Sequence, residues 1–413
     1  MKALIPAALL VIVAPALYAQ ATFVLPAPTG PHAVGTTSWH VIDSSRAETF
    51  TSSPARREVR VTGWYPAATS THRAGARAPY LRETLTEARA FASAIGSPGV
   101  FDNLASVETH SIVDDAIATG ATRLPVLVFS HGYTGLTSAY TSLLEDLASH
   151  GYIVLSIAHT YEVVATTLAN GVVVTMLDSA GAMRQGIKDV LNEWSDEDST
   201  MARSTRTTSE DEKLRILRGY LGGIPKTVDA IDRWVKDTKL VLDDLPTRHA
   251  LRTAGRLARR ANMTRIGVFG HSMGGVVAGQ FCVEDSRCRA GLNLDGIPQS
   301  GTMIDAKVKR PFLMVYSQRP GRLGASDPIY RRGASPYYRV DVDGARHADF
   351  SDMNFWGGPL KKFGIVGDIA PERAAEVTRL VVREYFDQEL RGKASPWLAG
   401  KIKLPDARAR LVR

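Results

Sequence analysis

The sequence predicts an α/β fold in which a mostly parallel, doubly wound sheet carries helices on both faces. The prediction comes from short, continuously apolar runs that recur along the chain and from amphipathic segments that separate them. The clearest unit consists of two apolar runs, Leu124–Phe129 and Tyr152–Ile157, with a helical pattern at Ser138–His150 between them. Because parallel strands are joined by a crossover connection, this unit is expected to be a βαβ element.

Less regular segments precede this unit. Residues 22–57 are rich in Pro, Gly, Ser and Thr, which is typical of an extended or loop-rich stretch. Glu58–Tyr65 alternates like a strand, and Pro66 is expected to end it. Residues 67–122 are expected to mix loops with a helix around Leu81–Ala94.

After the βαβ unit, residues 178–226 interrupt the alternation. They predict two short helices around a polar stretch, SDEDSTMARSTRTTSEDE. Such an insertion is either a cap or lid over a binding site or a mobile surface loop, and the sequence leaves both open. The mature chain, residues 22–413, is expected to form one domain that contains this insertion.

The alternation then resumes. An amphipathic helix is expected at Val228–Leu245, a second helix from Met273 and a last one from about Pro371 to Leu390. The remaining strands are expected at Arg265–Phe269, Ala290–Leu294, Pro311–Tyr316 and Tyr337–Val342.

Residues 1–21 have the form of a secretory signal peptide. Lys2 precedes an apolar run, Ala3–Leu17, and Ala19-Gln20-Ala21 has the small-x-small form of a signal-peptidase site. Cleavage is expected after the last alanine of this site, with the first as the alternative. The apolar run is short for a membrane span, so export to the periplasm or the medium is predicted rather than anchoring.

Composition narrows the function classes further. The 413 residues carry a formal net charge of +8, spread along the chain, and the densest basic patch lacks interleaved aromatic residues. Nucleic-acid binding is therefore disfavoured.

The two cysteines, Cys282 and Cys288, are expected to form a structural disulfide in an exported protein, with buried thiols as the alternative. The histidines show no paired ligand spacing, so no metal or other cofactor is implied.

A candidate nucleophile follows one of the expected strands. Gly270-His271-Ser272-Met273-Gly274 matches G-x-S-x-G, and it lies between an apolar strand and a helical run, which is the setting of the nucleophile elbow in α/β hydrolases. Ser272 is the predicted nucleophile. Gly270 and Gly274 are expected because side chains at these positions would clash in the sharp turn.

A second loop is placed to stabilise an oxyanion. Ser130-His131-Gly132-Tyr133 follows the strand Leu124–Phe129, the position from which α/β hydrolases supply an oxyanion donor. The backbone N–H groups of Tyr133 and Met273 are the predicted donors. His131 is expected to order this loop rather than to act as a base.

A serine nucleophile needs a base, and the base needs an orienting carboxylate. In α/β hydrolases the chain order is serine, acid, histidine, and His347 is the only histidine after Ser272. Two acids fit this order: Asp295 ends an apolar strand, and Asp327 lies in a loop after the next strand. From the residues alone, both remain candidates.

Several segments occur in an order and spacing that suggest a family. They are PTGPHAVGT, VTGWYPA, LPVLVFSHGYTG, SHGYIVLSIAH, GVFGHSMGG, LNLDG and DGARHADF. Together they resemble the platelet-activating factor acetylhydrolases, the plasma-type serine-dependent phospholipase A2 family, and their bacterial relatives. The resemblance covers most of the mature chain and is weakest in 178–226 and after 355. It implies that Asp295 is the acid, and it implies glycerophospholipids with short or oxidised sn-2 acyl groups as substrates.

The expected chemistry is hydrolysis of a carboxylic ester through an acyl-enzyme. The expected partner is a small-molecule or lipid ester, with transient contact to a lipid surface. Other interpretations stay open: an exported esterase for generic short-chain esters or polyesters, an acyltransferase with the same triad, or a non-catalytic lipid-binding protein. The joint presence of elbow, base and acid disfavours the last of these.

Overall fold

The computed structural model describes residues 23–51, 54–68, 76–120, 123–248, 252–362 and 364–412. The predicted signal peptide, residues 1–21, lies outside the described residues. The strands are β1 (Ala33–Ala47), β2 (Arg56–Ala67), β3 (Arg77–Pro79), β4 (Glu108–Val113), β5 (Leu124–Ser130), β6 (Ile153–Ala158), β7 (Ala165–Thr167), β8 (Val173–Thr175), β9 (Ala261–His271), β10 (Cys288–Leu294), β11 (Phe312–Ser317), β12 (Tyr337–Val342) and β13 (Ala407–Val412). The helices are α1 (Leu85–Ala94), α2 (Thr141–Ser149), α3 (Gln185–Asn192), α4 (Glu197–Arg206), α5 (Glu210–Gly222), α6 (Pro225–Asp244), α7 (Arg252–Arg260), α8 (Met273–Glu284), α9 (Asp327–Tyr330), α10 (Gly358–Lys362) and α11 (Pro371–Arg391).

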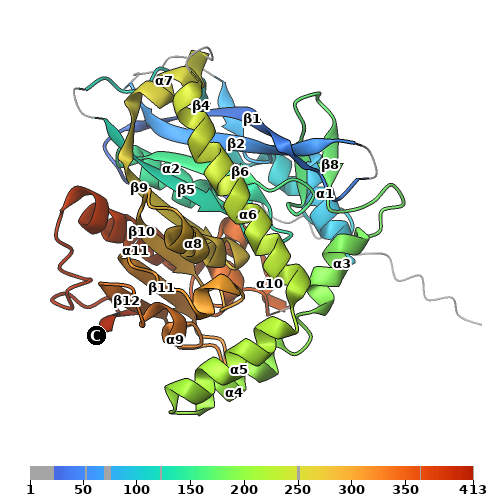
Figure 1. Ribbon diagram of the computed structural model, residues 1–413. Coiled ribbons are helices and arrows are strands. Elements are labelled where there is room, and N and C mark those ends of the chain that lie inside the picture. Colours follow the sequence, from blue (N-terminus) through green and yellow to red (C-terminus); the bar gives the residue numbers. More distant parts are fainter. Residues whose placement is uncertain are drawn as a thin grey trace, which may run out of the picture.

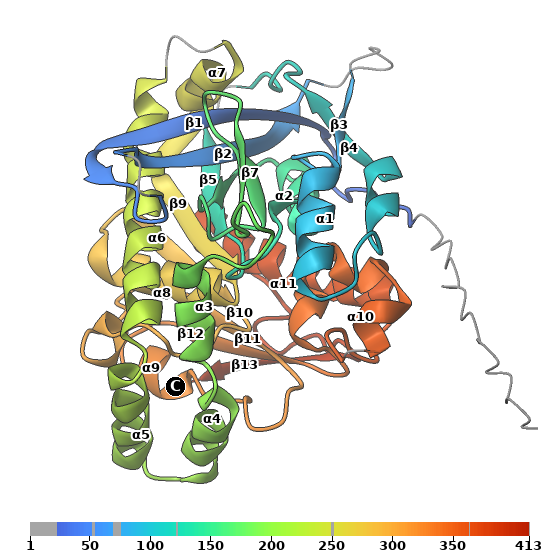
Figure 2. The ribbon, with the colours of Figure 1, turned by 90° about the vertical axis from the view of Figure 1, so that its right-hand side faces the viewer.

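One large sheet organises the described residues. Its order is β13-β12-β11-β10-β9-β5-β6-β2-β1-β4-β3, and β7 and β8 form a separate hairpin. The strands from β12 to β6 are mutually parallel, whereas β13 and β2 pair antiparallel with their neighbours. Figures 1 and 2 show α6 and α8 on one face of the sheet and α2 and α11 on the other. The prediction of a mostly parallel sheet with helices on both faces is confirmed.

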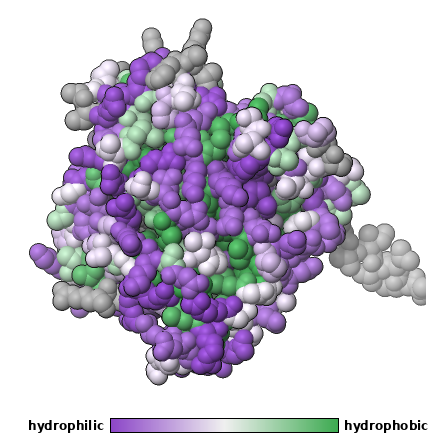
Figure 3. Space-filling model, in the orientation of Figure 1, coloured by the Kyte–Doolittle hydropathy of each residue, from purple (hydrophilic) through white to green (hydrophobic). Residues whose placement is uncertain are grey.

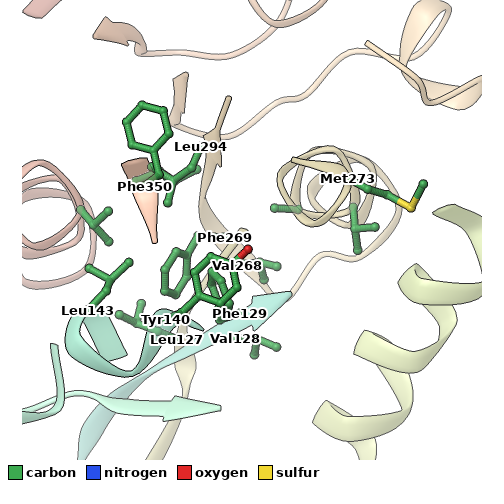
Figure 4. Close-up of a cluster of buried hydrophobic side chains, with 14 of the residues drawn as sticks. Leu127, Val128, Phe129, Tyr140, Leu143, Val268, Phe269, Met273, Leu294 and Phe350 are labelled. Atoms are coloured by element: carbon green, nitrogen blue, oxygen red, sulfur yellow. The ribbon is translucent and has the colours of Figure 1, made fainter. Parts of the chain in front are cut away.

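The central strands are apolar because both of their faces are covered. Residues 126–129 of β5 are fully buried, and each such large apolar side chain stabilises the fold by about 1.5–3 kcal/mol. Phe129 lies 4.9 Å from Phe269 of β9 and 4.7 Å from Tyr140, measured between ring centroids, and Figure 4 shows these three rings gathered together. This packing fixes the ends of β5 and β9 relative to each other, and the candidate site begins at those ends.

Several strands lie where the sequence predicts none: β1, β3, β4, β7, β8 and β13. Residues 22–57 were expected to be loop-rich, but β1 occupies Ala33–Ala47 and pairs antiparallel with β2 along most of its length. Its alternating burial shows that hydrogen bonding to β2 and one buried face form this strand, not continuous apolar content. The edge strand β13 is likewise formed by pairing with β12.

Pro66 does not end β2, because the strand continues to Ala67. On one side, Pro66 pairs with Val34 of β1. On the other side, β6 pairs with β2 only as far as Trp64. Pro66 therefore lies where one side of the strand has no partner, which is a position that tolerates the missing N–H.

The insertion contains three helices rather than the two expected. The polar stretch itself forms α4 and the start of α5, and these two helices lie side by side at one end of the molecule (Figures 1 and 2). Figure 3 shows that this end is largely hydrophilic. Helix α4 has Glu197 and Asp198 in its first turn and Arg203 and Arg206 in its last turn. Charges in this arrangement oppose the helix dipole and stabilise a helix that lacks an apolar face.

Candidate active site

Ser272 lies in the sharp turn between β9 and α8. Its φ of 55° and ψ of −125° are a combination that L-residues rarely adopt. The Ser272 N–H donates to the Leu294 carbonyl at 2.8 Å, and the Ser272 carbonyl accepts from the Gly275 N–H at 3.0 Å. These bonds hold the strained turn at the carboxyl end of β9, and Ser272 remains only partly buried there.

Gly270 and Gly274 lie where a side chain has no room. A Cβ atom on Gly270 would lie 2.6 Å from the Ser130 carbonyl oxygen, and one on Gly274 would lie 2.6 Å from the His131 carbonyl oxygen. Both oxygens belong to the backbone at the end of β5, which cannot give way alone. Close approach of the elbow to the loop after β5 therefore requires glycine at both positions.

His347 and Asp295 meet at the same edge of the sheet. The His347 Nδ1 lies 2.7 Å from the Asp295 Oδ2. Asp295 directly follows β10, has a φ of 58° and is 2% exposed, whereas the His347 side chain is 33% exposed. The Asp295 carboxylate also accepts from the N–H and the hydroxyl of Ser317, both at 2.8 Å, and pairs with Arg319 at 2.9 Å.

This environment keeps the Asp295 carboxylate charged. Burial alone would raise the pKa of Asp295, but the positive charge of Arg319 and the hydrogen bond from His347 outweigh burial and hold the pKa well below its usual range. Burial and the charge of Arg319 lower the pKa of His347, while Asp295 opposes this shift. A neutral His347 with Nδ1 bonded to Asp295 has its other ring nitrogen available as a proton acceptor.

Asp327, the other candidate acid, lies elsewhere. It begins α9, and its carboxylate accepts from the hydroxyls of Tyr316 at 2.9 Å and Tyr337 at 2.6 Å. Arg339 pairs with the same carboxylate at 2.7 Å. The structure thus brings Asp295 to His347 and gives Asp327 a different set of partners.

The loop after β5 lies against the elbow. A Cβ atom on Gly132 would be 3.2 Å from the Cβ of Ser272, so the backbone approaches the serine closely at this glycine. Within the described residues, no hydrogen bond uses the backbone N–H of Tyr133 or of Met273. Both N–H groups are therefore available to an oxygen atom beside Ser272.

His131 is enclosed in this loop rather than directed at a substrate. It is fully buried, its Nδ1 lies 2.7 Å from the Gly132 carbonyl, and its Nε2 accepts from the His159 N–H at 3.3 Å. Burial and the neighbouring His159 lower the pKa of His131 to about 3. A neutral ring with both nitrogens engaged orders the loop.

His271 and Tyr140 support the elbow from the other side. The His271 Nε2 lies 2.8 Å from the His347 carbonyl oxygen, and the Nδ1 lies 2.9 Å from the Tyr140 hydroxyl. Burial, with a smaller effect of His347, lowers the pKa of His271 to about 3. The ring is therefore neutral and links the elbow to the His347 backbone.

A buried ion cluster behind the oxyanion loop was not identified from the sequence. The fully buried Arg57 pairs with Asp237 at 2.7 Å, and His159 bridges Asp237, at 2.9 Å, to the Ser130 hydroxyl, at 3.1 Å. The Glu162 carbonyl accepts from the N–H of Thr134 at 2.9 Å. The members come from β2, from the segment after β6 and from α6, so no local pattern joins them. One local signal exists, because His159 directly follows the buried strand β6 and Glu162 lies shortly after it.

Arg319, which touches Asp295, was also missed. It lies in the loop after β11, where nothing in the local sequence distinguishes it from the many other arginines of the chain. Its importance comes from the adjacency of β10 and β11 in the sheet.

A disulfide joins Cys282, near the end of α8, to Cys288, the first residue of β10. It closes a short loop on the side of the sheet away from the elbow, which fits a structural role.

None of the helices in the described part of the chain has the length and apolar character needed to cross a membrane. Nor do the described His, Cys, Asp and Glu side chains form a group of three or more that could hold a metal ion.

The strand order, the elbow and the loops at the carboxyl edge of the sheet define an α/β-hydrolase fold. Residues 18–394 match the family model described as platelet-activating factor acetylhydrolase, isoform II. The chain belongs to this family.

Individual relatives are distant. The platelet-activating factor acetylhydrolase of Gallus gallus is 23% identical over 62% of this chain and 59% of its own length. The probable 1-alkyl-2-acetylglycerophosphocholine esterase of Arthroderma benhamiae is 25% identical over 67% of this chain and 63% of its own length. The chain thus spans about three fifths of the length of these curated relatives. A ferulic acid esterase from Streptomyces cinnamoneus has a similar structure, with a TM-score of 0.68, 26% identity, and coverage of 94% of this chain and 99% of that one.

Proposed function

We propose that this chain is a serine carboxylic-ester hydrolase that removes short or oxidised sn-2 acyl groups from glycerophospholipids. The observation that carries the proposal is the 2.7 Å contact between His347 and Asp295, at the sheet edge where the strained elbow holds Ser272. Membership in the acetylhydrolase family supports the lipid substrate.

In the proposed reaction, the Ser272 hydroxyl attacks the ester carbonyl while the His347 Nε2 takes its proton. The Nδ1 of the same ring donates to Asp295, which orients the ring and stabilises the imidazolium that forms. The imidazolium then protonates the leaving alkoxide, and the alcohol departs. Water activated by His347 cleaves the acyl-enzyme and restores the free serine.

The developing oxyanion is proposed to be held by the backbone N–H groups of Tyr133 and Met273. Their lack of other acceptors among the described residues supports this role. Each such donor lowers the barrier by about 3–4 kcal/mol when it is already in position. The buried cluster around Asp237 and His159 is proposed to keep the Tyr133 loop in that position.

The similarity to a ferulic acid esterase favours a second candidate, an esterase for carboxylic esters that are not phospholipids. This similarity extends over nearly the whole chain. The same Ser272 machinery would serve both candidates, so they differ in what the rest of the substrate contacts.

We further propose that the protein is exported to the periplasm or the medium and that residues 178–226 act as a cap. The form of residues 1–21 and the disulfide support export. Two contacts support the cap: the α4 side chains Glu197 and Asp198 both pair with Arg322, in the loop after β11. A mature N-terminus after residue 21 or 19, found by mass spectrometry of the exported protein, would establish processing.

The proposal is tested with esters that run from acetyl to long acyl, each with and without a phosphocholine head group. The purified protein is compared with Ser272→Ala and with the matched control Ser286→Ala, which changes an exposed serine between α8 and β10. Ser272→Ala is expected to abolish hydrolysis with its circular dichroism unchanged, whereas Ser286→Ala is expected to match the parent. Activity that survives in Ser272→Ala would refute the mechanism, and equal rates with and without the head group would favour the second candidate.

A further inference from the structure

An open cavity of about 730 Å³ lies between α4 and the loops that follow β11 and β12. Helix α4 contributes Asp198 and Arg206 to its lining, the loop after β11 contributes Arg319 and Gly321, and the loop after β12 contributes Arg346. The cavity adjoins the candidate active site, because Arg319 pairs with Asp295 and Arg346 directly precedes His347.

The lining is strongly cationic. Its one acidic side chain, Asp198, already pairs with Arg322. No carboxylate of the described residues lies within ion-pair distance of Arg206 or Arg346. Arg319 uses one terminal nitrogen on Asp295, while its buried Nε has no hydrogen-bond partner in the described part of the chain. A buried donor without an acceptor is costly unless a ligand supplies one.

The place of the cavity indicates which part of the substrate it faces. In a serine hydrolase the histidine hands its proton to the departing alkoxide, so the alcohol portion of the ester leaves past the histidine. Arg346 directly precedes His347 and Arg319 contacts its partner Asp295, so of the two portions of the ester the alcohol portion is the one assigned to this cavity.

The geometry points to this cavity as the binding site for the phosphate group carried by the alcohol portion of the ester, an inference that rests on the proposed function. Guanidinium groups present paired N–H donors that match phosphate oxygens, and they remain charged at every relevant pH. Arg206, on the insertion, would then bring the cap and the substrate together. The same chemistry would also accept free phosphate, so the experiment separates the two sources.

The test compares two acetyl esters with the same acyl group: a short-chain, monomeric 2-acetyl glycerophosphocholine lipid and a neutral glycerol analogue without phosphate. The quantity measured is the ratio of their kcat/KM values, which cancels effects on acyl transfer itself. Arg206→Gln is expected to lower this ratio about tenfold, the loss that follows from one charge-assisted hydrogen bond. Arg346→Gln, from a different loop, is expected to lower it in the same direction.

Arg203→Gln is the matched control. Arg203 lies on the same helix, but its guanidinium donates to the Thr200 hydroxyl at 3.2 Å, and it lines a different cavity. Its ratio is expected to equal that of the parent. An unchanged ratio in both Arg206→Gln and Arg346→Gln, or an equal fall in Arg203→Gln, would overturn the inference.

Inorganic phosphate forms the second arm. One result would identify free phosphate, not the phosphate of the lipid, as the ligand of this cavity and would overturn the inference. In that result phosphate inhibits hydrolysis of the neutral ester, inhibits it less in Arg206→Gln, and the ratio of the kcat/KM values is the same in Arg206→Gln as in the parent. If the parent hydrolyses neither ester, the proposed function fails instead. Calorimetric titration of Ser272→Ala with phosphate then tests the cavity alone: binding that Arg206→Gln weakens supports the site, and no binding overturns it.

Discussion

Arg319 is predicted to lower the pKa of His347, so that replacing it by glutamine raises that pKa. The Arg319 guanidinium lies 2.9 Å from the Asp295 Oδ2, the same oxygen that lies 2.7 Å from the His347 Nδ1. A protonated His347 would therefore carry its charge less than about 6 Å from the arginine, which disfavours the protonated form. The other groups that face this ring are Asp295 and Glu197, which act in the opposite direction, and His271, which is neutral.

Coulomb's law sets the size of the effect. Two unit charges about 6 Å apart interact by roughly 2.8 kcal/mol at an effective dielectric constant of 20 and by roughly 0.7 kcal/mol in bulk water. The His347 side chain is 33% exposed, so solvent screens this pair and the lower half of the range applies. Because one pKa unit corresponds to about 1.36 kcal/mol, the pKa of His347 is expected to rise by about 0.5 to 1.3 units in Arg319→Gln.

The assay is the pH dependence of kcat/KM for p-nitrophenyl acetate, which reports the base of the free enzyme. The proposed reaction needs a neutral imidazole, so activity falls as the pH drops through the pKa of His347. Arg319→Gln should move this acid limb to higher pH by the amount given above. Arg319→Lys keeps the positive charge and should leave the limb nearly in place. A limb that stays fixed in Arg319→Gln, or that moves to lower pH, would refute the electrostatic reasoning.

Three further predictions concern the acid, the disulfide and a buried carboxyl group. Asp295→Asn should lower kcat for p-nitrophenyl acetate by about 10³- to 10⁴-fold because the ring loses its orienting anion, whereas Asp327→Asn should lower it less than tenfold; the reverse order would give the role to Asp327. Replacing Cys282 and Cys288 together by serine should lower the free energy of unfolding by about 2 kcal/mol, because the lost link closes a short loop; a urea midpoint equal to that of the parent would contradict this. Burial raises the pKa of Glu87 to about 7 from its ordinary 4.5. Between these two values the folded chain keeps a proton that the unfolded chain releases. The free energy of unfolding should therefore fall as the pH rises from 5 to 7. Urea unfolding of Glu87→Gln should show a smaller fall, by about 2 kcal/mol over this pH range, and identical slopes in the two proteins would count against the assignment.

The sequence predicts those elements best whose formation depends on their own residues. The parallel strands β5, β6, β9 and β10 are continuous apolar runs, and the helices α6 and α11 carry a clear apolar face. The strands β1 and β13 form because neighbouring strands pair with them through hydrogen bonds and because the fold covers one of their faces. Neither condition can be predicted from the residues of β1 or β13 alone. Helix α4 is an intermediate case. Its acidic start and basic end are a readable helix signal, which the polar composition of the stretch conceals.

The residues of the candidate site likewise differ in how far the sequence alone predicts them. Ser272 and its glycines lie within five consecutive residues, and His347 is fixed by chain order, so both are accessible from the sequence. The choice between Asp295 and Asp327 is not, because both follow strands that lie at the same edge of the sheet. The structure separates them through the turn after β10, where Asp295 has a φ of 58°, and through the partners that Asp327 already has. The catalytic role of Asp295 stays a prediction until the two asparagine variants are compared.

The contact between Arg319 and Asp295 has a cost and a benefit for the proposed reaction. The Asp295 Oδ2 receives His347, the Ser317 hydroxyl and Arg319, so the imidazolium forms beside an anion that is already partly neutralised. This makes His347 a weaker base for the attack by Ser272, and it makes the imidazolium a stronger acid for the step that protonates the departing alkoxide. An arginine at this position therefore favours substrates whose alcohol is a poor leaving group, as the glycerol oxygen of a lipid ester is. Removing the arginine should accordingly slow hydrolysis of an alkyl acetate more than that of p-nitrophenyl acetate, whose leaving group needs no proton, and an equal loss on both esters would show that Arg319 only holds Asp295 in place.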